Sequence, residues 1–304
     1  MATRETGAGS SGKRGATAPP RSGQEPRDAR EPRDASAPRD QAAGLRDAAQ
    51  GASEVIPALP AIAVTGGKGG VGKTCIAVNL ALTLLELGVR PLLVDLDLGL
   101  ANADVMLGVA AGITLQDVIS GGKPASAALQ RLPSGLSFIP AASGREELTR
   151  LQARSLHRLL REVGKVAFGH DLIVFDTAAG IGREVSLPLQ ASRVVLVVVT
   201  PEPTSLTDAY ALIKVLEQAS PGKDIRVLVN QAADQEEGAA TFARLRKVAQ
   251  SYLRRDLRLA GCVPRARAVG EAVRARKPFA GNVNSSAAKA LRALALGLKA
   301  ETWR

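Results

Sequence analysis

Apolar residues gather in short runs that alternate with longer amphipathic stretches over most of the chain. The runs have the length of β-strands, and we expect strands at 61–65, 91–95, 136–140, 172–176, 194–200, 225–230 and 257–263. Uninterrupted β-branched runs such as 194–199 are typical of strands that are buried on both faces, so the sheet should be mainly parallel with helices between its strands. The pattern predicts one doubly wound α/β domain, which we place at residues 58–304.

The N-terminal part of the chain has a different composition. Residues 1–39 are rich in Ala, Pro, Gly, Ser, Arg and Asp and contain almost no bulky apolar side chains, so we expect this extension to be disordered. Residues 40–50 are helix formers, and Pro57 and Pro60 separate them from the first strand. This short stretch has the features of a tethered recognition helix.

The 304-residue chain has a formal net charge of +11. The charge is uneven, because 15 basic and 3 acidic residues follow position 240. Such an excess suits an anionic partner such as DNA, a lipid surface or an acidic protein, but Arg-rich solvated helix faces are the simpler interpretation.

Several classes of protein are disfavoured by composition. Cys75 and Cys262 are too few for a disulfide framework, and no N-terminal stretch resembles a secretory signal. The apolar run at 194–199 is far shorter than the roughly 20 residues needed to span a bilayer. His157 and His170 lack the spacing of a zinc site. We therefore expect a cytoplasmic protein.

One motif carries explicit chemistry. Residues 67–74 match G-x-x-x-x-G-K-[ST] and lie between a predicted strand and a predicted helix, the context that a phosphate-binding loop requires. The glycines let backbone N–H groups approach phosphates, Lys73 neutralises charge and Thr74 can ligate Mg²⁺. A Gly-rich turn is the alternative. The residues expected to bind nucleotide here are Gly67, Lys68, Gly69, Gly70, Val71, Gly72, Lys73, Thr74 and Cys75.

Three carboxylates follow predicted strands. Asp95 and Asp97 end the strand at 91–95 and, at i and i+2, point to the same side of an extended chain. Asp176 ends the strand at 172–176. Carboxylates at neighbouring strand ends beside a phosphate loop suit Mg²⁺ and an attacking water molecule. The structural alternative for each is a helix cap or a loop anchor.

The second lysine of the loop, Lys68, makes the segment similar to the MinD/ParA-like class of ATPases. The resemblance implies an ATP-bound homodimer in which Lys68 reaches the nucleotide of the partner subunit. It further implies that Asp97 positions or activates the attacking water, that Asp95 supports the hydrated metal, and that Asp176 holds Mg²⁺ through water.

The same class supplies expectations for the base. Asn230 stands where a purine-reading Asn is found, although a plain turn-former is a rival interpretation. Pro264 and Arg265 resemble the loop that lines the base.

Within this class, the stretches 95–108, 140–144, 176–181 and 202–214 resemble the FlhG (FleN) family of flagellar regulators. Residues 40–46 match that family's activator motif D-Q-A-x-x-L-R. The resemblance implies control of flagellar number or placement through a flagellar transcription activator and the GTPase FlhF. Gln41 would lie near the GTP of FlhF, and Asp40, Leu45 and Arg46 complete the binding motif.

The C-terminal helix allows two interpretations. Leu291, Leu294 and Leu298 form an apolar stripe that could lie in a membrane interface, which would place the protein peripherally at the inner membrane face or the cell pole. The same leucines could cover the sheet, and we favour this because the stripe is narrow. Ser285 or Ser286 could cap the helix.

Two other functions fit the sequence. A partition ATPase would bind DNA through the basic C-terminal region in a salt-sensitive manner. A nucleotide-binding scaffold would require Asp97 to be idle.

Overall fold

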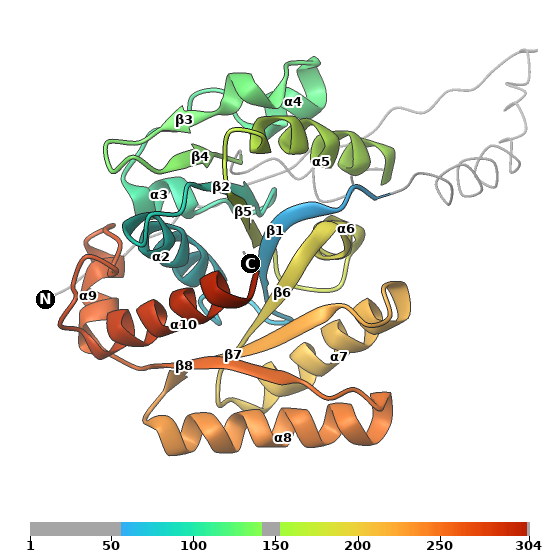
Figure 1. Cartoon of the computed structure of the whole chain (residues 1–304), viewed down its shortest axis with the longest axis vertical. Coiled ribbons are helices and arrows are strands. Elements are labelled where there is room, and N and C mark those ends of the chain that lie inside the picture. Colours follow the sequence, from blue (N-terminus) through green and yellow to red (C-terminus); the bar gives the residue numbers. More distant parts are fainter. Residues whose placement is uncertain (1–55, 142–152, 303–304) are drawn as a thin grey trace, which may run out of the picture. The chain divides into compact units, whose positions relative to one another are not determined.

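The computed structural model describes residues 56–141 and 153–302, and within them eight strands form one sheet (Figure 1). Their spatial order is β3-β4-β2-β5-β1-β6-β7-β8, and all neighbouring pairs except β3–β4 are parallel. The strands are β1 (Leu59–Thr65), β2 (Pro91–Leu96), β3 (Gln130–Arg131), β4 (Ser137–Ile139), β5 (Leu172–Thr177), β6 (Ser192–Val199), β7 (Asp224–Ala232) and β8 (Arg258–Pro264).

The doubly wound, mainly parallel sheet is therefore confirmed, and each of the seven expected runs overlaps a strand. Strand β3 was missed. It has two residues and pairs only with β4, so it is too short to produce an alternation of apolar and polar positions. The expected extension at 1–39 and helix at 40–50 lie outside the described residues.

Both faces of the sheet are covered by helices. In β1, Ala61 and Ala63 join one apolar core while Ile62 and Val64 join the other, as the period of a strand requires. The first face carries α4 (Leu115–Gly121), α5 (Ala153–Ala167), α6 (Arg183–Ala191), α7 (Pro203–Ala219) and α8 (Gln235–Leu253), with the 3-10 turn η1 (Ala125–Ala128). The second carries α2 (Lys73–Glu86), α3 (Ala103–Leu107), α9 (Arg267–Arg274) and α10 (Ser286–Thr302).

Helix α10 covers the second face beside α2 (Figure 1). Leu291, Leu294 and Leu298 are all buried there, so the sheet-covering alternative is confirmed for this stripe and the interfacial one is wrong. The helix begins at Ser286, and the preceding Ser285 accepts a hydrogen bond from the Ala288 N–H through its hydroxyl. In the described part of the chain, no helix is both long and apolar enough to cross a membrane.

The register of the strands brings distant residues to one edge of the sheet. Asp176 of β5 is the register partner of Val64 in β1 and of Asp95 in β2. Asn230 of β7 pairs with Val263 of β8. These positions lie at the carboxyl ends of their strands, where ligands bind in open α/β sheets.

Candidate functional site

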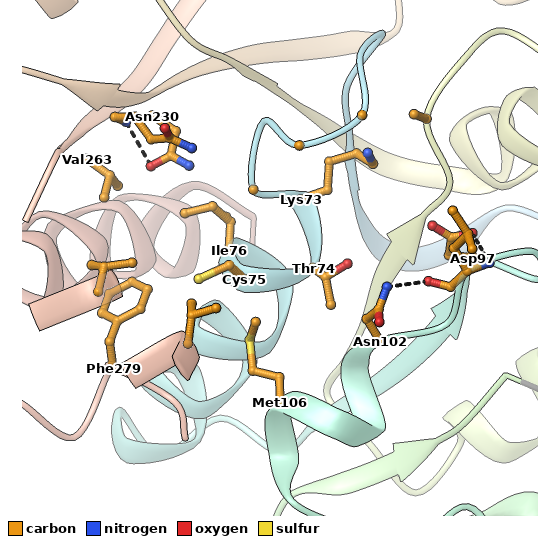
Figure 2. Close-up of a pocket in the computed structure, with 18 of the residues that line it drawn as sticks. Lys73, Thr74, Cys75, Ile76, Asp97, Asn102, Met106, Asn230, Val263 and Phe279 are labelled. Atoms are coloured by element: carbon orange, nitrogen blue, oxygen red, sulfur yellow. Dashed lines mark hydrogen bonds between the residues drawn. The ribbon is translucent and has the colours of Figure 1, made fainter. Parts of the chain in front are cut away.

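A cavity of about 970 Å³ opens at the carboxyl edge of the sheet. Figure 2 shows Lys73 and Thr74 near its centre, with Asp97 and Asn230 on opposite sides. The predicted residues that line it are Gly69, Gly70, Gly72, Lys73, Thr74, Cys75, Asp97, Asn230, Pro264 and Arg265. The fold thus joins the loop at 67–75, the end of β2 and the ends of β7 and β8 around one space.

The loop has the backbone that a phosphate-binding turn needs. Gly70 and Gly72 have φ values of 80° and 97°, in the left-handed region that favours glycine. Gly67 is required for packing instead, because a methyl group there would overlap the backbone of Asp208 in α7. The loop is therefore held against α7 on one side and runs directly into α2 at Lys73 on the other.

Lys73 is buried at the cavity, with its Nζ 3.5 Å from the Lys68 carbonyl oxygen. Burial lowers the pKa of the Lys73 ammonium, while Asp176 and Asp97 raise it. The next residue but one, Cys75, has its pKa raised to about 11 by burial and by Asp176, so its thiol stays protonated. An anionic ligand would add negative charge beside this buried ammonium and so favour its charged form.

Lys68 is not among the residues that line the cavity. Its Nζ lies 2.7 Å from Glu202 Oε2 and 2.8 Å from the Thr204 hydroxyl, both at the start of α7. The pKa of the Glu202 carboxyl is lowered, chiefly by the hydrogen bond from Lys68 and more weakly by Arg265. An exposed ion pair with Glu202 thus holds the Lys68 side chain beside the start of α7.

The two carboxylates after β2 have different surroundings. Asp95 is buried, and its oxygens accept hydrogen bonds from the backbone N–H groups of Asp97 at 2.9 Å and Ala103 at 3.3 Å. Burial and the nearby Asp176 raise the Asp95 pKa well above its ordinary range. These contacts make Asp95 an anchor for the loop between β2 and α3, which was the structural alternative for this residue.

Asp97 reaches the cavity from the same loop. Its Oδ1 accepts a hydrogen bond from the Leu100 N–H at 3.0 Å, which closes a turn, and Asn102 donates to the Leu100 carbonyl at 2.7 Å (Figure 2). The second oxygen of Asp97 accepts no hydrogen bond from the described residues, and the side chain lines the cavity. Asp97 is therefore held in position while an oxygen is left for a ligand or water.

Asp176 is fully buried beneath the loop. Burial raises its pKa to about 7, against the lowering effects of Thr74 and Lys73. Neither carboxylate oxygen makes a hydrogen bond of normal geometry to the described residues. Such an orphaned acceptor beside the Thr74 hydroxyl fits hydrated Mg²⁺, because hard oxygen ligands and bound water are what this ion prefers.

The cavity is also lined by residues to which the sequence patterns assigned no role. Met106 of α3, Val273 of α9 and Phe279 form an apolar wall, and Gln231 follows Asn230 in β7. These apolar residues belong to no sequence motif. They come together because α3 and α9 both pack beside the cavity. Gln231 could have been noticed as the neighbour of Asn230. The predicted partner-binding residues Asp40, Gln41, Leu45 and Arg46 lie outside the described residues.

Comparisons with known proteins identify the family of this chain. A family model described as an AAA domain matches residues 60–227. The antiactivator FleN of Pseudomonas aeruginosa PAO1 is 43% identical over 243 residues, which is 80% of this chain and 86% of that protein. The flagellum site-determining protein YlxH of Helicobacter pylori is 38% identical over 219 residues, covering 71% of this chain and 73% of that protein.

A solved structure has the same fold. The septum site-determining protein MinD of Pyrococcus horikoshii, determined with Mg-ADP, is 25% identical with a TM-score of 0.64, covering 78% of this chain and 95% of that one. One conclusion follows from the phosphate loop, from the carboxylates at the ends of β2 and β5, and from the extent of these matches. The chain belongs to the FleN (FlhG) family of MinD-like P-loop ATPases.

Proposed function

We propose that this protein is an ATP-hydrolysing switch that controls flagellar number or placement. The observation that carries the proposal is the 43% identity to FleN over 80% of the chain, together with a cavity in which Lys73, Thr74 and Asp97 surround one space. The relative is described as an antiactivator, and YlxH as a flagellum site-determining protein. Regulation of partner proteins, rather than turnover of a metabolite, fits both descriptions.

In the proposed reaction the loop from Gly69 to Thr74 holds the phosphates of ATP and Lys73 neutralises their charge. Thr74 and Asp176 hold hydrated Mg²⁺, which supplies further neutralisation of the phosphates when it is bound. Asp97 orients the attacking water through the carboxylate oxygen that its own turn leaves unused. Asp95 keeps the loop of Asp97 in place through its two backbone hydrogen bonds.

ATP would also drive formation of a homodimer. Lys68, now held by Glu202 and Thr204, would exchange these partners for the phosphates of the neighbouring subunit's nucleotide. Size-exclusion chromatography with light scattering tests this step. The Asp97→Ala variant should dimerise stably with Mg-ATP because hydrolysis is blocked, whereas Asp97→Ala combined with Lys68→Ala should stay monomeric. A dimer of unchanged stability in the double variant would contradict the role of Lys68.

The activator segment at 40–50 is proposed to bind FlhF and to stimulate its GTP hydrolysis. A peptide of residues 39–50 should accelerate phosphate release by FlhF, and its Gln41→Ala version should not, because a glutamine near the nucleotide can position water. Binding of both peptides is measured in parallel, so that loss of stimulation is separated from loss of docking. No stimulation by the peptide or by the full chain would remove FlhF from the proposal. Modulation of a flagellar transcription activator is the second proposed output.

A partition-type function with DNA as partner is the alternative, favoured by exposed cations near the C-terminal end. Arg258, Arg265, Arg267, Arg274 and Arg276 are all exposed. Binding to DNA should then fall steeply as salt is raised, since phosphate contacts release counterions. DNA binding that needs ATP and falls steeply with salt would favour this function, and its absence at low salt would remove it.

A further inference from the structure

Helix α5 presents a one-sided basic surface on the outside of the molecule. The residues of this helix that are exposed are all cations: Arg154, Arg158, Arg161 and Lys165. Successive cations are separated by four, three and four positions, so they lie on one face of the helix in a row roughly 17 Å long. The opposite face of α5 is buried in the first core of the sheet.

Phe168 extends this row beyond the end of the helix. It follows Lys165 by three positions and is 94% exposed, more than any other large apolar side chain in the described part of the chain. A single exposed apolar residue is ordinary on a protein surface. Here, however, the phenyl ring stands beside three arginines, and aromatic side chains and arginine are enriched at the centres of protein–protein interfaces. We call the four cations and Phe168 the α5 surface.

The α5 surface keeps an excess of positive charge. Glu162 is the one acidic residue of α5, and it already pairs with Lys165. The pKa of the Glu162 carboxyl is lowered, chiefly by the hydrogen bond from Lys165 and more weakly by Arg158. The end of α4 lies beside the row, because a methyl group at Gly122 would be 3.8 Å from the Arg158 guanidinium. The next residue, Lys123, is exposed and adds another cation.

Two carboxylates near the ends of neighbouring elements have local roles. Asp117 closes the capping box of α4 by accepting a hydrogen bond from the Thr114 N–H. Asp171, which precedes β5, pairs with Arg90. These carboxylates therefore serve the turns in which they lie rather than the row of cations on α5.

The α5 surface is separate from the nucleotide site. Helix α5 leads into β5, whose carboxyl end carries Asp176, so Phe168 lies toward the opposite, amino end of that strand. Figure 1 shows α5 beside α4, on the outside of the sheet. No residue of the α5 surface lines the cavity. A partner bound to this surface therefore leaves the cavity open to nucleotide.

The chemistry of the row distinguishes among anionic partners. Guanidinium groups pair bidentately with carboxylates, and a second helix can present carboxylates at the same spacing of three and four positions. A lipid surface is a poorer match, because an interfacial helix needs apolar side chains along its length, and the leucines of α5 are buried. Duplex nucleic acid presents a phosphate backbone, which offers no apolar contact for Phe168.

We propose that the α5 surface binds an acidic helical segment of a partner protein. The carboxylates of that segment pair with the row of cations, and its apolar residues cover Phe168. Such binding does not depend on ATP hydrolysis, because the residues involved lie outside the cavity. It would give the protein a docking site that is distinct from its proposed nucleotide switch.

The test uses the full-length chain and a fluorescently labelled helical peptide as the probe. The peptide carries Glu at the spacing of the α5 cations and Leu at both ends, so that either chain direction places an apolar residue at Phe168. Fluorescence anisotropy should show tighter binding than for a peptide of the same composition in shuffled order, and added salt should weaken it. Arg158→Glu and Phe168→Ser should each reduce the affinity about tenfold, as expected for loss of a charged or aromatic anchor.

Two matched controls lie on α10, which covers the other face of the sheet. Lys289→Glu and Leu296→Ser make comparable changes at exposed positions there and should leave the peptide affinity unchanged. All four variants should keep the wild-type melting temperature and rate of ATP hydrolysis, because each side chain is exposed and none lines the cavity.

Equal binding of the patterned and shuffled peptides would overturn the inference, as would an unchanged affinity in Arg158→Glu and Phe168→Ser. A third result would also overturn it. If the wild type bound anionic phospholipid vesicles or duplex DNA but not the peptide, and the two variants lost that binding, the α5 surface would serve a lipid or a nucleic acid instead of a protein.

Discussion

The phosphate end and the base end of the cavity are built in different ways. At the phosphate end, one continuous segment supplies Gly69, Gly70 and residues 72–75 to the cavity lining, and the buried Asp176 is left with unsatisfied oxygens. At the base end, β7, β8 and α9 each supply a few residues, and the buried Asn230 has satisfied its amide within the protein. The first end is arranged to bind charge, while at the second end the Asn230 amide is hydrogen-bonded within the protein.

This difference shows how ligand-binding and structural polar groups can be told apart. A buried polar group costs desolvation free energy unless it finds a partner, so an orphan such as Asp176 beside the phosphate loop is a candidate ligand-binding group. A satisfied group such as Asn230 or Asp95 indicates a structural brace, even when a motif places it near the ligand. The following predictions test each assignment, beginning with the largest expected effect.

Loss of the Asp97 carboxylate should have the largest effect on chemistry. Asp97→Ala should lower the rate of ATP hydrolysis by about 100-fold or more, the usual contribution of a group that positions or activates a nucleophile. Affinity for ATP should change little, because the loop and Lys73 remain. The measurement is phosphate release at saturating ATP, with binding followed separately.

Asp104→Asn is the matched control for Asp97→Asn. Asp104 lies on α3, where its carboxylate accepts a hydrogen bond from the Val105 N–H, and it does not line the cavity. Equal loss of activity in the two Asn variants would mean that the loop, rather than the carboxylate of Asp97, is responsible, and a fully active Asp97→Asn would support the scaffold hypothesis.

A methyl group at Gly67 should displace the phosphate loop, because the loop packs against α7 at this position. Gly67→Ala would overlap the Asp208 backbone in α7, which has no flexible side chain to yield. Overpacking of this kind costs about 1–3 kcal/mol, so ATP affinity should fall by about tenfold or more as the loop is displaced. Gly121→Ala is the control, since a methyl group there meets nothing within 4 Å and Gly121 does not line the cavity. Equal affinities for the two variants would show that packing of the loop against α7 is not needed.

The buried carboxyl of Asp176 should make the nucleotide-free protein less stable as the pH rises. Its folded pKa of about 7 exceeds the ordinary value of 3.8, so the unfolded chain releases its proton first. The free energy of unfolding therefore falls between about pH 4 and pH 7 and levels off above. Asp176→Asn should remove this part of the slope in urea unfolding at pH 5 and pH 8.

Asp171→Asn provides a control of opposite sign for the pH experiment. The Arg90 guanidinium holds the pKa of Asp171 below its ordinary value, so its contribution is lost only as the pH falls further. Between pH 5 and pH 8 this variant should keep the wild-type slope. A wild-type slope in Asp176→Asn would mean that other groups set the pH dependence.

The ion pair on the rim should matter least to the folded monomer. Glu202→Gln removes the partner of Lys68, but both side chains are exposed, and pairs of this kind rarely contribute to stability. The melting temperature without nucleotide should stay within experimental error, as it should for Glu271→Gln, which breaks the exposed pair with Arg267. A clear drop in the melting temperature of Glu202→Gln alone would indicate that the pair of Lys68 and Glu202 contributes more to stability than an ordinary surface ion pair.

The sequence predicted the sheet and the phosphate loop because both are encoded by neighbouring residues. Buried strands appear as uninterrupted apolar runs, and the loop residues act through their own backbone. Strand β3 could not be predicted, since two residues carry no periodicity. The sequence did not show that the Asn230 side chain bonds to the Val71 carbonyl either, because the two residues are 159 positions apart in the chain.

By itself, the sequence determined that a strand, a glycine-rich loop and a helix follow one another at residues 59–86, and that carboxylates end β2 and β5. Local pattern is sufficient there, because the chemistry lies in one segment or at the end of one strand. Only the tertiary structure decided that α10 covers the sheet, that Asp95 anchors a loop while Asp176 remains unsatisfied, and that Asn230 braces Val71 across 159 positions of chain. Each of these depends on which polar groups find partners when distant segments pack together, and that pairing is fixed by the fold.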